Sequence, residues 1–91
     1  MLTVQNASFS RSAQGVACIT LDDPAFARAD VVFIDPSSRQ ISALLGDLHF
    51  RIGVCDEAMA ATFLKNHSVI LTARHPQGHE LALMAPVLTL Q

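Results

Sequence analysis

The sequence of 91 residues has no tryptophan and no tyrosine, and it carries one lysine beside five arginines. Its formal net charge is −2, and the cationic residues form no run or stripe. A nucleic-acid surface needs clustered cationic side chains and usually aromatic rings on which bases stack. The composition therefore argues against nucleic acid as a partner.

Long apolar runs are also missing. No apolar stretch approaches the ~20 residues that a membrane-spanning helix needs. The first twelve residues, MLTVQNASFSRS, lack the charged start and the apolar centre of a secretory signal peptide. We therefore expect a cytoplasmic protein with no membrane partner. Abundant alanine, together with more arginine than lysine, is typical of a GC-rich bacterial genome.

Cysteine is scarce, and Cys18 and Cys55 lie far apart with no CxxC spacing. Buried thiols are the usual state of cysteines in a reducing compartment, and whether these two can pair stays open. Cys55 lies at the start of an expected helix, a position that lowers the pKa of a thiol. Because Asp56 and Glu57 follow directly and oppose a thiolate, a buried structural thiol is favoured there over a reactive one. Cys18, within an alternating strand, is expected to pack.

Apolar residues are abundant for so short a chain. They make up 51% of the sequence, and charged residues make up 15%, against about 25% in an average domain. A domain of this size buries only about 60–65% of the surface of its unfolded chain, so apolar patches should remain exposed. We expect them to be covered in a homodimer or higher homo-oligomer, with another protein as the alternative partner. A dense monomeric core rich in alanine is the rival interpretation.

Turn signals at intervals of 8–12 residues predict a single α+β domain over residues 1–91. We expect a small antiparallel sheet of six to eight short hairpin-connected strands, strongly bent or closed into a barrel or sandwich. The expected strand segments are residues 2–10 (with a bulge), 16–21, 31–34, a hairpin over 40–54, and two or three strands within 68–90. The core is expected to include Val32, Ile34, Ile41, Ala43, Phe50, Ile52, Met59, Phe63, Leu71, Leu81 and Leu83.

The hairpin over residues 40–54 has the clearest pattern. Gly46 and Asp47 fit a two-residue type II′ turn, with glycine at the first central position. This turn pairs three sets of apolar residues on one face: Leu45 with Leu48, Ala43 with Phe50, and Ile41 with Ile52. His49 falls on the other, wetter face and is expected to be a surface histidine.

One longer helix is predicted over about Cys55–Asn66, ending at Asn66 or His67. Met59 and Phe63 are four residues apart, which builds an apolar stripe on one side of the helix. We expect this stripe to pack over one face of the sheet or to plug one end of it.

Several polar pairs have a structural explanation. Asp22 and Asp23 invite a carboxylate-dyad or cation-site hypothesis, but Asp23 before Pro24 is the usual start of a helical turn. Ser37 and Ser38 follow Asp-Pro and are expected to be turn residues. Pro86 cannot donate to a ladder, so it predicts an edge, a bend or a bulge in the last strand.

The stretch RHPQGHE, residues 74–80, contains the side chains that most suggest a functional site. Pro76 and Gly78 favour a three-residue hairpin loop that His75 and His79 close, with Arg74 facing Glu80 across the strands. Two imidazoles supply two ligands, whereas a zinc site needs three or four. His49, His67 or the histidines of a second copy remain as further ligands. The favoured interpretation is a plain hairpin tip.

No phosphate-binding loop, dinucleotide fingerprint or complete catalytic set is present in the sequence. We therefore predict no enzyme activity, and we assign no catalytic, cofactor-binding or metal-binding residue. The leading hypothesis is a non-catalytic binding or assembly module that works as a homo-oligomer. The alternative is a small-ligand or metal-binding domain with a pocket between helix and sheet.

Overall fold

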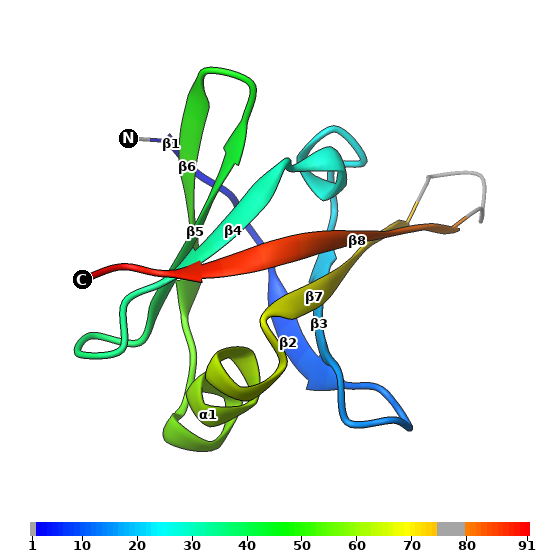
Figure 1. Cartoon of the computed structure of the whole chain (residues 1–91). Helices are drawn as coiled ribbons and strands as arrows, with labels where there is room; N and C mark the ends of the chain where they lie inside the picture. The colour runs from blue at the N-terminus through cyan, green and yellow to red at the C-terminus, as the bar shows by residue number, and fades with distance from the viewer. Residues whose placement is uncertain (1, 75–79) are drawn as a thin grey trace.

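The computed structural model describes residues 2–74 and 80–91. Within them, eight strands form one strongly curled sheet, a half-barrel, with one α-helix and one short 3-10 helix (Figure 1). The order across the sheet is β1-β6-β5-β4-β8-β7-β3-β2. The elements are β1 (Leu2–Thr3), β2 (Ser8–Arg11), β3 (Ala17–Leu21), η1 (Phe26–Arg28), β4 (Val31–Ile34), β5 (Gln40–Leu45), β6 (Leu48–Val54), α1 (Glu57–Asn66), β7 (Ser68–Arg74) and β8 (Glu80–Thr89).

The sheet is mixed. Its antiparallel pairs are the hairpins β2–β3, β4–β5, β5–β6 and β7–β8. Parallel pairs, β1–β6, β3–β7 and β4–β8, join these hairpins to one another. The prediction of a bent, sheet-dominated fold with one packed helix is confirmed, whereas the prediction of an antiparallel sheet holds only for the hairpins. Turn residues specify how consecutive strands pair, and they carry no information about how separate hairpins meet.

Strand β8 changes its partner at Pro86. It pairs with β7 from Glu80 to Pro86 and with β4 from Val87 to Thr89. The N–H of Val87 donates to the carbonyl of His67 on the β7 side at 2.9 Å, so the nitrogen of Pro86 points to the β4 side, one residue before that ladder begins. The proline therefore removes no ladder hydrogen bond. The sequence predicted an edge, a bend or a bulge at this proline, whereas β8 runs unbroken through Pro86 and changes its partner there.

The N-terminal segment connects the two edges of the sheet. Strand β1 lies at one edge and β2 at the other, with four residues between them, which span at most about 17 Å. Asn6 has a left-handed φ of 58° and turns the chain there. The prediction of one bulged strand over residues 2–10 is therefore wrong. Phe9 on β2 lies 3.7 Å from where a Cβ on Gly53 of β6 would stand, so the two edges approach each other.

The β5–β6 hairpin keeps the predicted turn but not the whole predicted register. Gly46 has a φ of 58°, as the first position of a type II′ turn requires. The pairs Leu45 with Leu48 and Ala43 with Phe50 are confirmed. The pair Ile41 with Ile52 is wrong, because an irregularity next to Ile41 sets it opposite Gly53. Such a bulge adds bend to the strand, which suits the curl of the sheet.

Helix α1 lies at one end of the curled sheet (Figure 1). Asp56 caps it, because its Oδ1 accepts the N–H of Met59 at 2.8 Å. The predicted stripe of Met59 and Phe63 is buried, and the ring of Phe63 meets Phe9 edge to face at 6.1 Å. Across residues 2–74 and 80–91, no helix combines the length and the apolar composition that crossing a bilayer requires.

Most of the predicted core is buried in one hydrophobic cluster. Leu81 is only half-buried, and Leu83 is 36% exposed, so the prediction for Leu83 is wrong. Leu83 shares the inward side of β8 with the buried Ala85, but it lies nearer the start of the strand, where β8 pairs with β7 alone.

The end of α1 offers a test of the fold. His67 has a left-handed φ of 57°, and its backbone N–H and carbonyl bond to Phe63 and Val87. His67→Gly keeps both backbone bonds and relieves the unfavourable φ, so the free energy of unfolding should rise by about 1 kcal/mol in urea denaturation. Lys65→Gly, inside the helix, is the matched control and should lower stability by about 1 kcal/mol. Destabilisation by both variants would contradict this account.

Candidate self-association surface

The outward side of β8 is apolar and exposed. Side chains alternate between the two faces of a strand, and Ala85 and Val87 point inward and are buried. On the outward side, Met84 is 65% exposed, Leu88 is 53% exposed, and Leu90, just beyond the strand, is 43% exposed. A strand near the middle of the sheet therefore presents large apolar side chains to solvent.

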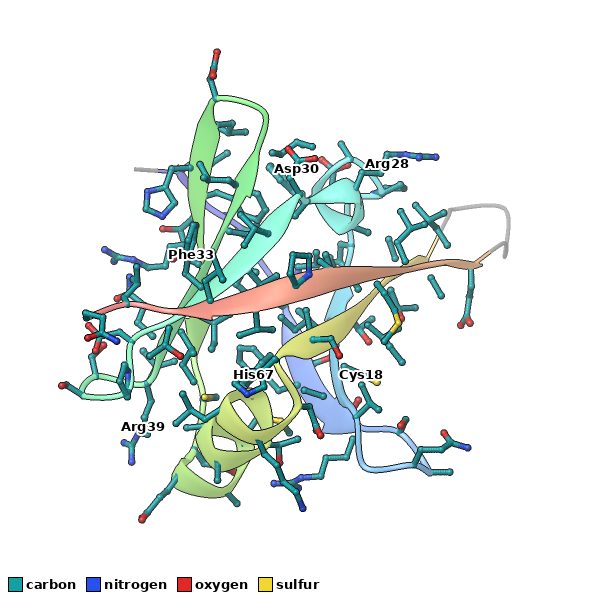
Figure 2. The ribbon with its side chains drawn as sticks, viewed as in Figure 1. Cys18, Arg28, Asp30, Phe33, Arg39 and His67 are labelled. Atoms are coloured by element: carbon teal, nitrogen blue, oxygen red, sulfur yellow. The ribbon has the colours of Figure 1, made fainter. Side chains whose placement is uncertain are left out.

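Neighbouring strands extend this surface. Ile70 of β7 lies opposite Met84, and Phe33 of β4 lies beside Leu88, each on the same outward face. Figure 2 shows β8 crossing the view between Phe33 on one side and Cys18 beyond β7 on the other. The surface, called the β8 face below, is formed by Phe33, Ile70, Ala82, Met84, Pro86, Leu88 and Leu90.

The charged side chains near the β8 face lie at its margins. No charged residue occurs between Leu81 and Leu90 in the sequence. Beside Phe33 lies the buried Ser42, and only beyond it, on β6, comes Arg51. His49 on the same strand touches the edge of the Phe33 ring, with centroids 6.0 Å apart. The face is thus an uncharged band whose border is cationic on the β6 side.

Sequence reasoning did not single out Met84 or Leu88, although a signal was present. In the stretch LALMAPVL, residues 81–88, both alternating sets are apolar. Such a strand is usually covered on both faces. Here Ala85 and Val87 of the inward set are buried, whereas Met84 and Leu88 of the outward set are exposed. Among the residues that the structure describes, no layer covers this outward set.

The histidine pair of the sequence hypothesis, His75 and His79, lies outside the described residues. Around it, the predicted hairpin register is confirmed, with Arg74 paired to Glu80. His49 and His67 are both exposed. Within residues 2–74 and 80–91, no group of three or more His, Cys, Asp or Glu side chains is arranged to hold a metal ion.

The thiol of Cys55 is held neutral. Cys55 is 4% exposed, and its Sγ donates to the carbonyl of Arg39 at 3.5 Å. Burial is the largest effect and raises the pKa of the Cys55 thiol. A backbone hydrogen bond lowers this pKa, the carboxylate of Asp56 raises it, and Arg39 lowers it, each by less than burial does. A reactive thiolate is therefore disfavoured. Both Cys18 and Cys55 are free, and Cys18 is half-buried on the outward side of β3.

The polar pairs act as turn caps. Oδ1 of Asp23 accepts the N–H of Ala25 at 2.9 Å, directly after Pro24. Oδ1 of Asp35 accepts the N–H of Ser37 at 2.9 Å and that of Ser38 at 3.4 Å. The prediction of turn residues at Ser37 and Ser38 is confirmed. The prediction of Asp23 as a helix N-cap is wrong, because the helical turn is only the three-residue η1 and its N-cap is Ala25.

A pocket of about 370 Å³ lies beside the N-terminal segment. Its lining combines apolar and polar side chains and includes no residue of α1: Leu2, Thr3, Val4, Gln5, Asn6, Leu21, Asp22, Asp23 and Phe26. Its volume is at the lower end of the range for small-molecule sites. It lies elsewhere than the pocket between helix and sheet that the sequence suggested.

Comparison of the chain with protein-family models, with curated proteins and with solved structures gives no match. Its function is therefore argued from its own residues.

Thiol labelling tests the state of Cys55. In the native protein at neutral pH, a water-soluble thiol reagent should modify Cys18 first, because Cys55 is buried and its pKa is raised. The labelling rate of Cys55 should increase only as the pH rises above the ordinary thiol pKa. Peptide mass spectrometry after timed labelling measures both rates, with unfolded protein as the control in which both thiols react. Equal rates in the native protein at neutral pH would contradict the prediction.

Proposed function

We propose that this chain is a non-catalytic assembly module that works as a homo-oligomer through the β8 face. The observation that carries the proposal is the concentration of exposed large apolar side chains. Of the seven among the described residues, three lie on the β8 face: Met84, Leu88 and Leu90. Contiguous apolar surface of this kind is typical of protein–protein contact sites.

The dimensions of the face bear on the size of the interface. At about 3.3 Å per residue and about 4.8 Å between strands, β8 and the residues of β7 and β4 that pair with it cover on the order of 300 Å². Small specific interfaces bury about 600 Å² per partner, so the proposed interface also includes border residues on neighbouring strands. An interface at this end of the range favours association in the micromolar range over permanent assembly.

The absence of catalysis is part of the same proposal. Three aspartates, Asp23, Asp35 and Asp56, use their carboxylates to cap turns or the helix. The thiol of Cys55 is buried and its pKa is raised. These groups are committed to structure, which favours a role that depends on surface contacts.

Oligomeric state tests the proposal. At micromolar concentration, light scattering and sedimentation should give at least twice the monomer mass. The double variant Met84→Gln/Leu88→Gln should shift the protein to monomer, because burying two unpaired amides opposes association. The matched control is Val54→Gln/Leu48→Gln, which changes side chains that are 60% and 42% exposed on β6. The control should keep the mass of the unmodified protein, and a monomeric unmodified protein would end the proposal.

Binding of a small ligand in the N-terminal pocket is the second candidate function. Its support is the pocket itself, with an apolar base that includes Leu21 and Phe26 and two carboxylates at Asp22 and Asp23. This arrangement suits a ligand with an apolar body and a cationic group. Native mass spectrometry of the purified protein should then show a bound mass that Val4→Trp, which fills the pocket, removes. An identical spectrum for the variant would count against this function.

A further inference from the structure

We infer that the second copy docks with its β8 antiparallel to the first, about a two-fold axis through Pro86. This inference rests on the proposed self-association, and it names the partner surface as the same β8 face. The face has an elongated shape along one strand, and its outward residues follow one another at every second position. The geometry of that single row decides how two copies fit together.

The apolar part of the row, from Ala82 to Leu90, is centred on Pro86, and Glu80 precedes it on the same side of the strand. Met84 and Leu88 stand two residues to either side of it, and Ala82 and Leu90 stand four residues to either side. In the antiparallel arrangement, Met84 meets Leu88 of the second copy, and Ala82 meets its Leu90. Pro86 meets its own copy at the axis, and the contacts on either side join unlike side chains. The smallest residue then faces a large one, which allows the close packing of protein interfaces.

The alternative two-fold axis runs along β8 and keeps the strands parallel. Each residue would then meet its own copy, with Leu90 against Leu90 at one end and Ala82 against Ala82 at the other. The large pair would hold the two sheets apart and leave a gap beside the small pair, which costs contact energy. Ala82 and Leu90 lie at equal distances from Pro86. The antiparallel arrangement, which places the small residue against the large one, is therefore favoured.

The charge distribution favours a second copy over a different protein. From Ala82 to Leu90 the row carries no charge, so two copies bring no like charges together at its centre. Partners that must be selected from many proteins usually display complementary charges that exclude wrong partners. A row that is uncharged and complementary to itself can bind a second copy without such a charge pattern.

Cross-linking of single cysteine variants tests the axis. The background is Cys18→Ser, which leaves only the buried Cys55. Facing sheets lie about 10 Å apart, which is too far for a direct disulfide, so a short bifunctional maleimide is used. Met84→Cys and Leu88→Cys are expressed singly and also co-expressed with distinguishable tags. Cysteine is itself apolar, so these variants should keep the dimer that light scattering measures.

The mixed cross-link between Met84→Cys and Leu88→Cys should form several-fold faster than either homotypic cross-link. Val54→Cys, similarly exposed on β6, is the control and should cross-link slowly. Faster homotypic linking of Met84→Cys would overturn the antiparallel axis and leave the proposed function standing. Linking of both β8 variants no faster than the control, in a protein that still has dimer mass, would overturn the surface itself. Failure of the proposed function is distinct, because the unmodified protein is then a monomer.

Discussion

Strand β8 forms backbone hydrogen bonds with β7 along its first part and with β4 along its last part, and the order of the sheet depends on this exchange. On one side of β8 lie β4, β5, β6 and β1, and on the other side lie β7, β3 and β2. The short N-terminal segment then connects the two outer edges. Since a proline has no N–H, Pro86 loses no ladder hydrogen bond at the point where β8 exchanges β7 for β4.

The same residue links the fold to the proposed assembly. Pro86 stands in the middle of the outward row, where its ring adds apolar surface and no hydrogen-bonding group. The inward row of β8 closes the core through Ala85 and Val87, and the outward row contains Met84, which is the most exposed large apolar residue among those that the structure describes. One strand therefore serves the interior of the monomer and, under the proposal, the interface of the oligomer.

Features that depend on residues close together in the sequence were predicted correctly. Gly46 at a type II′ turn, Asp56 as a helix cap and the stripe of Met59 and Phe63 were all expected from the sequence and are present. The parallel ladders were not predicted, because the sequence of one segment does not reveal which distant segment pairs with it. The β8 face was missed for a related reason: its alternation shows two apolar sides, but whether a layer covers the outer side depends on distant parts of the chain.

The parallel ladders also determine how this chain should fold. Leu2 pairs with Phe50, Ala17 with Val69, and Val32 with Val87, each joining residues about fifty positions apart. Hairpins close within microseconds, whereas contacts of such sequence separation carry a large loop-closure cost and slow the whole process to milliseconds or longer. Preformed hairpins with open edges should therefore accumulate early, and productive folding competes with their intermolecular pairing. Dilution during refolding should raise the yield of native protein for this reason.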